Sequence, residues 1–238
     1  MNIEETKKLA NKIEGWLSDR EGETLYNLAM NCKGKGVIVE IGSWKGKSTI
    51  WIGNGSKNGK KIKVYAIDPH KGSSEHQKEN KKIWTFEEFK NNIKKAKLDD
   101  IIVPLVKTSE EAAKNFNKPV EFIFIDGAHE YEFVKLDFDL WFPKVVNGGI
   151  IAFHDTIGCW SGPKKVVADC VYKSKHFKDV KFIDTITFAR KVNQNTLKDR
   201  IKNRYVLLLK NSYELISKLY LPKPIRVLGK KIIVKILH

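Results

Sequence analysis

The chain has 238 residues, 42% of them hydrophobic and 30% charged, which suits one large α/β domain or a domain with an appendage. No stretch approaches the run of about 20 apolar residues that crosses a bilayer, and the charged N-terminus contains no apolar signal segment, so a cytoplasmic location is expected. The three cysteines are an odd number without C-x-x-C spacing, which argues against a disulfide framework and against a zinc site.

The net charge of +16 raises the possibility of a nucleic-acid-binding protein, but the positive charge is unevenly distributed. Residues 193–238 contain 11 Lys and Arg and two acidic residues, Asp199 and Glu214, and therefore carry a charge of +9. Much of the excess thus lies in a C-terminal extension, outside the part of the chain in which strands and helices alternate. We therefore expect no nucleic acid among the partners.

The spacing of apolar residues predicts alternating strands and helices along most of the chain. Residues 1–35 are predicted to form helices, with a break near Ser18 and Asp19. Short β-branched runs are typical of buried parallel strands, and they occupy 36–42, 61–69, 101–107, 120–127 and 148–155, with a final hairpin over 180–191. Helices are predicted at 46–54, 85–97, 109–116, 130–142 and about 163–173, and the polar stretch 70–84 is interpreted as a loop or lid.

This alternation indicates an α/β fold with a doubly wound, mostly parallel sheet. The predicted organisation is an N-terminal helical segment (1–35), a ligand-binding α/β domain (36–192) and a basic, amphipathic C-terminal extension (193–238). In such sheets ligands bind outside the carboxyl ends of the strands, so the residues that follow each strand are the candidates for function.

The first predicted strand runs into "EIGSWKGKS", residues 40–48, a glycine-containing turn before a helix. Only three residues separate Gly42 from Gly46, one fewer than a Walker A phosphate loop needs. Trp44 stands where a dinucleotide-binding turn has its second glycine. The turn instead suits a ligand with a cationic amino-acid group, with the backbone of Gly42 against it and the Glu40 carboxylate nearby.

The next two strand ends suggest the rest of this ligand. Asp68 ends the second strand, where a carboxylate can accept hydrogen bonds from both hydroxyls of a ribose. Lys107, Thr108 and Ser109 follow the third strand and are placed to border an adenine. An amino-acid end, a ribose and a base together describe S-adenosylmethionine.

Four segments, "VEIGSWKGKST", "VYAIDP", "FIFIDGAHEYEFVKLDFDLW" and "NGGIIAFHDT", resemble class I S-adenosylmethionine-dependent methyltransferases. The likeness covers roughly residues 20–192 and is greatest to the small-molecule and sugar O-methyltransferases that include the macrocin- and novobiocin-tailoring enzymes. It implies a seven-stranded, Rossmann-like methyltransferase fold. It also implies S-adenosylmethionine as the cofactor, and the residues expected to bind it are Glu40, Gly42, Ser43, Gly46, Ser48, Asp68, Ser109 and Asp126.

Two aspartates end neighbouring strands of the predicted sheet. Asp126 follows the fourth strand and Asp155 the fifth, and adjacent strands lie about 5 Å apart, so the two carboxylates can share one ion such as Mg²⁺. In the resembling enzymes, acidic residues at these positions hold a divalent ion that binds the hydroxyls of the substrate. Thr156 stands where relatives have Asn or a second Asp and is a poorer ligand. A metal site and a simple capped turn at Asp155 and Thr156 therefore both stay open.

Two histidines are candidates for the general base that deprotonates the acceptor. His129 lies beyond a strand end, which favours it. His154 and Asp155 are adjacent, so strand alternation predicts side chains on opposite faces unless the strand has already ended. Catalytic roles are thus predicted for Asp126, His129 and His154, and a packed, hydrogen-bonded core histidine is the alternative for His154.

Three other aromatic residues carry weaker expectations. Trp160, in the loop after Asp155, is the tryptophan most expected to contact a substrate. His70 and His76 belong to the polar stretch 70–84 and are expected to be exposed to solvent.

The basic extension has two apolar stripes at helical spacing. The first comprises Leu197, Ile201, Tyr205, Leu208, Leu215 and Leu219, and the second comprises Ile225, Leu228, Ile232 and Ile236. These stripes are expected to pack on the catalytic domain or on a second copy of the chain, which would give a homodimer. The alternative is peripheral contact with an anionic membrane.

The sequence thus predicts an enzyme that transfers a methyl group from S-adenosylmethionine to a hydroxyl of a small molecule, sugar or glycoconjugate. The first alternative is an RNA methyltransferase. Base-modifying enzymes of this class carry Asn/Asp-Pro-Pro-aromatic after the fourth strand, and "DGAH" in that place counts against it. The second alternative is a non-enzymatic S-adenosylmethionine-binding protein, which the intact set of Glu40, Gly42, Asp68 and Asp126 disfavours.

Overall fold

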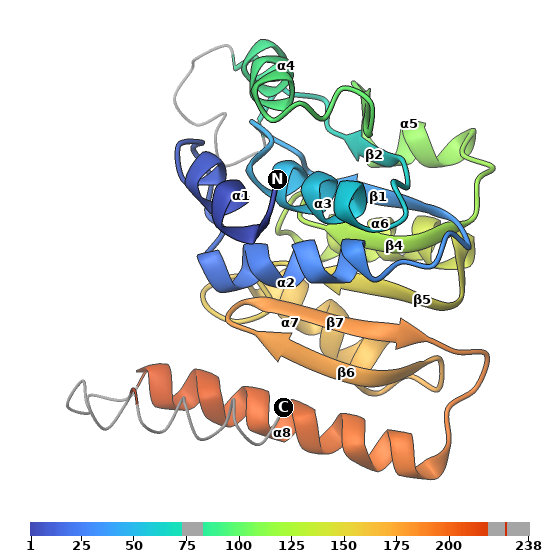
Figure 1. Ribbon diagram of the computed structural model, residues 1–238. Coiled ribbons are helices and arrows are strands. Elements are labelled where there is room, and N and C mark those ends of the chain that lie inside the picture. Colours follow the sequence, from blue (N-terminus) through green and yellow to red (C-terminus); the bar gives the residue numbers. More distant parts are fainter. Residues whose placement is uncertain (73–82, 219–226, 228–238) are drawn as a thin grey trace.

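The computed structural model describes residues 1–72, 83–218 and 227 and is built on a central seven-stranded sheet (Figure 1). The strand order is β3-β2-β1-β4-β5-β7-β6. The strands are β1 (Val37–Ile41), β2 (Val64–Ile67), β3 (Ile102–Leu105), β4 (Val120–Ile125), β5 (Val145–Phe153), β6 (Phe177–Ile183) and β7 (Ile186–Lys191). Strands β1 to β5 are parallel, and β7 pairs antiparallel with both β5 and β6. The predicted mostly parallel α/β sheet and its final hairpin are confirmed.

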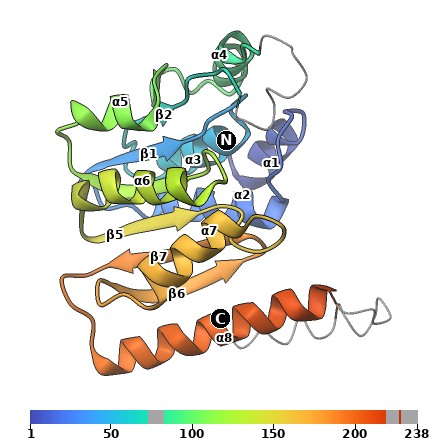
Figure 2. The same ribbon diagram turned by 180° about the vertical axis from the view of Figure 1, so that it is seen from behind.

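Helices cover both faces of the sheet. One layer contains α1 (Ile3–Ala10), α2 (Asp19–Met30), α3 (Lys47–Asn58) and α4 (Phe86–Lys95), and the other contains α5 (Ser109–Lys114), α6 (Tyr131–Trp141) and α7 (Ser161–Val166). Opposite views show α2 and α3 in front of the sheet in Figure 1 and α6 and α7 in front of it in Figure 2. The helix predicted over 163–173 is present as α7, but it continues as a π-helix over Val167–Tyr172.

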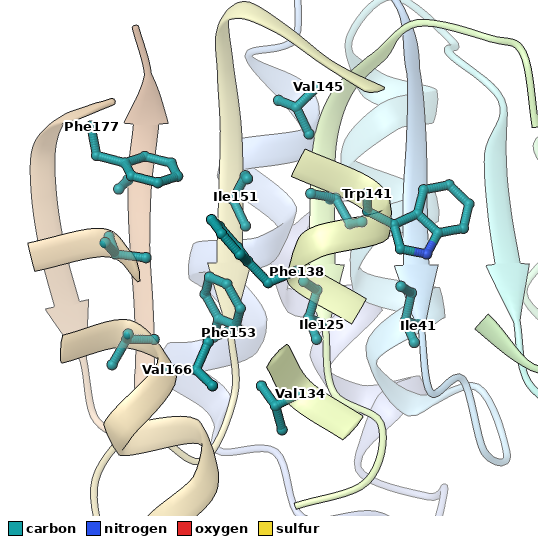
Figure 3. Packing of buried hydrophobic residues seen from close by; sticks show 14 of the residues in the cluster. Ile41, Ile125, Val134, Phe138, Trp141, Val145, Ile151, Phe153, Val166 and Phe177 are labelled. Carbon is teal, nitrogen blue, oxygen red and sulfur yellow. The ribbon is translucent and has the colours of Figure 1, made fainter. Parts of the chain in front are cut away.

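Each helix layer buries its own hydrophobic core against the sheet. In the core of Figure 3, Phe138 and Trp141 of α6 lie over strand residues such as Ile125 and Phe153. All six residues of β4, which lies at the centre of the sheet, are buried. Because both faces of the central strands are covered, polar side chains with a chemical role are expected at or close to the ends of those strands.

The break predicted near Ser18 and Asp19 is the start of α2. The Ser18 hydroxyl accepts a hydrogen bond from the Glu21 N–H at 3.3 Å, and Glu21 Oε2 accepts one from the Ser18 N–H at 2.8 Å. This reciprocal capping box fixes the direction of the Glu21 side chain. Glu21 is buried, and it reappears in the candidate active site.

The C-terminal extension begins with α8 (Leu197–Lys218), which lies along the outer edge of the sheet beside β6 (Figures 1 and 2). The predicted helix is present, but its first apolar stripe does not pack on the catalytic domain, so of the two expected ways of covering it only packing on a second copy of the chain stays a prediction. Stripe residues Leu197, Ile201, Tyr205, Leu208 and Leu215 are 49–64% exposed. The face that packs on the domain instead carries Asn203, Val206, Leu209, Lys210 and Tyr213, all of them buried.

Some expectations fall outside the described residues. They are the greater part of the loop at 70–84, with His76, and Leu219 together with the second apolar stripe. Across the chain as far as it is described, no helix has both the length and the apolar character that a membrane span requires.

Candidate active site

The carboxyl ends of β1, β4 and β5 lie side by side. Ile41 pairs with Ile125, and Ile125 pairs with Phe153. One residue further on, the Asp126 N–H donates to the Ile41 carbonyl at 2.8 Å, and the His154 N–H donates to the Ile125 carbonyl at 3.0 Å. The residues that follow these strands therefore meet at one edge of the sheet, as the strand pattern predicts.

Asp126, His129, His154 and Asp155 form a hydrogen-bonded group at this edge, the aspartate–histidine cluster. His154 Nδ1 lies 3.0 Å from Asp126 Oδ1 and 3.1 Å from Asp155 Oδ2, so one imidazole joins both carboxylates. His129 Nε2 lies 3.0 Å from the same Asp155 oxygen, and its ring stacks on that of Trp160 with 4.3 Å between centroids. The structure thus brings together both candidate histidines and both candidate metal ligands.

The alternation argument that places His154 and Asp155 on opposite faces is wrong for this chain. Strand β5 ends at Phe153, and the backbone of Asp155 has a φ of +53°. Aspartate tolerates this left-handed conformation better than most residues. Because the extended strand has already ended, the Asp155 carboxylate turns back toward His154.

His154 supplies the positive charge of the cluster, and its side chain is 4% exposed. Burial disfavours the charged imidazole, but attraction to Asp126, the hydrogen bonds with Asp126 and Asp155 and the nearby Glu21 carboxylate raise the pKa of His154 well above its ordinary value of 6.5. Burial also opposes ionisation of Asp155, yet hydrogen bonds with His129 and His154 hold the pKa of Asp155 well below its usual range. These shifts favour an imidazolium at His154 beside ionised Asp155, whereas burial raises the pKa of Asp126 despite the attraction of His154.

Glu21 belongs to this site and is not among the predicted residues. Its Oε2 lies 3.6 Å from His154 Nε2, and its Oε1 accepts hydrogen bonds from the Thr185 N–H at 2.8 Å and hydroxyl at 2.6 Å. Burial opposes ionisation, but His154, Thr185 and Ser18 together lower the pKa of Glu21 to about 2. The sequence signal was the S-x-x-E capping box, which locates the carboxylate without revealing what it faces.

Thr156 is turned away from the aspartates. Its hydroxyl donates to the Thr185 carbonyl at 2.7 Å and lies 2.7 Å from the Thr187 hydroxyl, and the residue is fully buried. The Thr156 N–H also donates to the Thr185 carbonyl, at 2.9 Å. Thr156 therefore ties the loop to the final hairpin, and its hydroxyl offers nothing to a metal at the cluster.

Asp126, His154 and Asp155 can each offer one ligand atom to a metal, and these atoms lie within 4.8 Å of one another. Two carboxylates and an imidazole form a mixed oxygen and nitrogen set, which suits Mn²⁺, Fe²⁺ or Zn²⁺ better than Mg²⁺. His154 can bind a metal only after it loses the proton that the carboxylates stabilise. The residues thus fit a divalent ion, but proton and metal compete for the same nitrogen.

Glu40, near the end of β1, and Ser43, in the loop that follows it, leave two buried polar atoms without partners among the described residues. Glu40 Oε2 accepts a hydrogen bond from the Thr49 hydroxyl at 2.5 Å, whereas Glu40 Oε1 and Ser43 Oγ have none among the described residues. Burial, opposed by the nearby Ser48 and Thr49 hydroxyls, raises the pKa of Glu40 to about 8. A neighbouring cation would favour the ionised carboxylate, so this loop fits a cationic amino-acid group.

The glycines of the same loop have structural reasons of their own. Gly42 and Gly46 have φ values of +86° and +91°. A Cβ on Gly42 would lie 1.9 Å from the Asp126 carbonyl oxygen, so this glycine permits close approach of another strand's backbone, a requirement different from the predicted contact with the ligand. Gly46 caps α3, and a Cβ there would lie 3.2 Å from the ring of Phe89.

Asp68 accepts two backbone hydrogen bonds beyond the end of β2. Its Oδ2 accepts one from the Trp44 N–H at 2.7 Å, and its Oδ1 accepts one from the His70 N–H at 2.6 Å. Each carboxylate oxygen has a second lone pair, so Asp68 can still accept hydrogen bonds from ribose hydroxyls. The expectation of a solvent-exposed His70 is wrong, because its ring is buried against Phe89 and its Nδ1 lies 2.9 Å from the Thr85 hydroxyl.

Ser109, predicted to border an adenine, begins α5 and is half-buried. Its hydroxyl accepts a hydrogen bond from the Trp141 indole N–H at 2.9 Å and also interacts with Asp137. Burial, despite that interaction, raises the pKa of Asp137 to about 6. Ser109 thus connects α5 to α6, and its role toward a cofactor stays a prediction.

Residues 39–156 match the protein family described as "Methyltransferase domain". The match begins within β1 and ends just after Asp155, so it contains both the Glu40 loop and the aspartate–histidine cluster. These residues are a methyltransferase domain. The prediction of a methyltransferase domain is thereby confirmed for these residues.

Individual proteins are also similar to this chain. An uncharacterised protein, R132 of Acanthamoeba polyphaga mimivirus, is 31% identical over 121 residues, which are 49% of this chain and 50% of that protein. The chain matches half or less of the length of its curated relatives. The solved O-methyltransferase NovP aligns with 74% of this chain and 81% of its own at a TM-score of 0.63 and 17% identity. An O-methyltransferase from Bacillus cereus in complex with SAH aligns with 79% and 90% at a TM-score of 0.56 and 17% identity. These structures share the methyltransferase fold.

Proposed function

We propose that this domain transfers the methyl group of S-adenosylmethionine to a hydroxyl of a small molecule or sugar. The observation that carries the proposal is the meeting of two different sites at one sheet edge. One is the buried loop around Glu40, which fits a cation, and the other is the aspartate–histidine cluster. The close approach of Gly42 to the Asp126 backbone joins them. Solved O-methyltransferases with SAM or SAH bound are among the similar structures, which supports this choice of cofactor.

Six of the predicted cofactor-binding residues have roles that follow from their chemistry. The unpartnered atoms of Glu40 and Ser43 bind the amino-acid part of the cofactor, and Asp68 accepts from the ribose hydroxyls. Ser48 acts indirectly through its hydroxyl near Glu40, which favours the ionised carboxylate, and the glycines shape the loop.

The acceptor side must deprotonate and orient a hydroxyl, because the methyl group of a sulfonium is already electrophilic. His129 Nε2 faces Asp155, so Nδ1 is the basic atom of the neutral imidazole. His129 is therefore the general base in this proposal: it takes the proton as the oxygen–methyl bond forms and the sulfur–methyl bond breaks. His154 is a positioning residue that holds both aspartates.

A divalent ion held by Asp126, His154 and Asp155 would add Lewis acidity and lower the pKa of a bound hydroxyl. Titration calorimetry of the full chain with Mn²⁺ at about pH 8 tests this part of the proposal. We expect binding that weakens about tenfold or more in Asp155→Asn and persists in Asp139→Asn, the same change on an exposed part of α6. If the wild type binds neither Mn²⁺ nor Mg²⁺, the cluster works with the His154 cation alone.

Titration of the full chain with S-adenosylmethionine tests the cofactor. We expect binding in the wild type, and an affinity about 10- to 100-fold lower in Asp68→Asn, because a charged acceptor of ribose hydrogen bonds is lost. Asp139→Asn again serves as the matched control and should bind like the wild type. No binding by the wild type would refute the proposed function, and unchanged affinity in Asp68→Asn would refute the ribose assignment.

A further inference from the structure

Helix α8 carries an apolar stripe on the side that faces away from the domain. The stripe residues, the α8 stripe, are Leu197, Ile201, Tyr205, Leu208 and Leu215, each 49–64% exposed. The opposite side of the same helix is buried through Val206, Leu209 and Tyr213. α8 is therefore apolar on two sides, and only one of them is covered by the part of the chain that the structure describes. Figures 1 and 2 show the helix lying along β6.

Cationic side chains border the α8 stripe. Lys198, Lys202 and Arg204 are all exposed. The two acidic residues of the helix are engaged elsewhere: Asp199 accepts from the Thr196 N–H at 3.0 Å, and Glu214 pairs with Lys164 of α7. The outward side of α8 thus presents leucine, isoleucine and tyrosine between positive charges.

We infer that the α8 stripe binds the surface of an anionic lipid bilayer. A helix with this pattern lies in the plane of the headgroups, where its apolar side chains insert and its basic flanks meet anionic phosphates. Five exposed apolar residues on one helix side form the apolar part of such a surface, and the cations supply the preference for negative charge. This inference concerns a surface separate from the aspartate–histidine cluster and does not depend on the proposed reaction.

The positive charge beside the α8 stripe argues against two other partners, a second copy of the chain and the C-terminal residues 219–238. Pairing of the α8 stripes of two copies would bring the Lys and Arg flanks of both copies together, and like charges repel. Residues 219–238 fit poorly for the same reason, because their sequence contains five Lys and Arg and no acidic residue. An anionic bilayer is the partner whose charge complements the flanks.

Cosedimentation of the full chain with phosphatidylcholine vesicles that contain about one-third phosphatidylglycerol tests the inference. We expect binding to these vesicles that is at least about tenfold stronger than binding to pure phosphatidylcholine and that weakens as salt increases. The double variant Ile201→Glu/Leu208→Glu should bind at least about tenfold more weakly, since it replaces two inserting side chains with anions. Both positions are exposed, so the folded state should persist, and circular dichroism checks this.

The matched control is Phe133→Glu/Leu136→Glu, which makes the same chemical change at exposed side chains of α6. It should bind vesicles like the wild type. The inference would be overturned by unchanged binding in the α8 double variant, by an equal loss in the control, or by equal binding to uncharged vesicles. A dimer that depends on the α8 stripe, seen by sedimentation velocity in a chain that does not bind vesicles, would overturn it in favour of a second copy.

Discussion

Gly42→Ala is expected to lower the free energy of unfolding by about 4 kcal/mol or more. The φ of +86° accounts for about 1–2 kcal/mol of this loss. The larger part comes from the added Cβ, which would lie 1.9 Å from the Asp126 carbonyl oxygen, so the ends of β1 and β4 must separate. Urea denaturation measures the loss, and the strand displacement should also disturb the cluster that Asp126 belongs to.

Gly34→Ala separates the two causes. Gly34 has a φ of +84°, close to that of Gly42, but a Cβ there would meet no described atom within 4 Å. Its expected cost is therefore the conformational one alone, about 1–2 kcal/mol. Equal losses in the two variants would contradict the close approach of β1 and β4 as the cause.

His154→Asn is expected to destabilise the protein by about 3 kcal/mol near neutral pH. The asparagine amide can keep one hydrogen bond to Asp126 or Asp155 but carries no charge. The buried Glu21 and the partly buried Asp126 and Asp155 would then lose their central cation. His176→Asn, at an exposed histidine, is the control and should change stability by less than about 1 kcal/mol.

The loss in His154→Asn should depend on pH, in a direction set by the cluster. In the wild type, Glu21 and Asp155 have lower pKa values in the folded state than in the unfolded state. They therefore stabilise the fold above their unfolded-state pKa values, and this stability disappears as the pH falls through their folded-state pKa values. The raised pKa of His154 contributes stability below 6.5, which disappears as the pH rises through its folded value.

The difference in the free energy of unfolding between wild type and variant is therefore expected to be greatest between pH 4.5 and pH 6.5. These limits are the ordinary pKa values of Glu21 and His154. It should shrink at lower pH, where the carboxyls of the variant become protonated and no longer need a cation. Denaturation at acidic, neutral and alkaline pH tests this shape. A loss that is the same at every pH would show that packing of the ring, and not its charge, is what His154 supplies.

The fold was predictable because buried parallel strands leave a distinct pattern. The segment predicted at 120–127 appears as β4, buried along its whole length. The convergence of Asp126 and Asp155 was predictable as well, since carboxyl ends of neighbouring parallel strands meet at one edge. The relation of Asp155 to His154 was not, because alternation holds only while the backbone stays extended and Asp155 is left-handed.

Helix α8 shows a second limit of prediction from hydrophobic periodicity. Periodicity reveals which residues share a face, but it does not say which face is buried when a helix is apolar on two sides. Leu208 and Leu209 are adjacent in the sequence, and the structure exposes the first and buries the second. Only the shape and chemistry of the neighbouring β6 and π-helix decide between them, and these are tertiary facts.

The position of Glu21 determines which fragment of the chain can contain the complete candidate site. The matched methyltransferase segment begins at residue 39, yet Glu21 of α2 faces His154 and binds Thr185 in the turn between β6 and β7. A transplanted segment from 39 to 156 would carry both aspartates and leave this third carboxylate behind. A fragment that keeps the complete site must therefore include helix α2 and the hairpin of β6 and β7. It must be longer than the segment from 39 to 156 that matches the family.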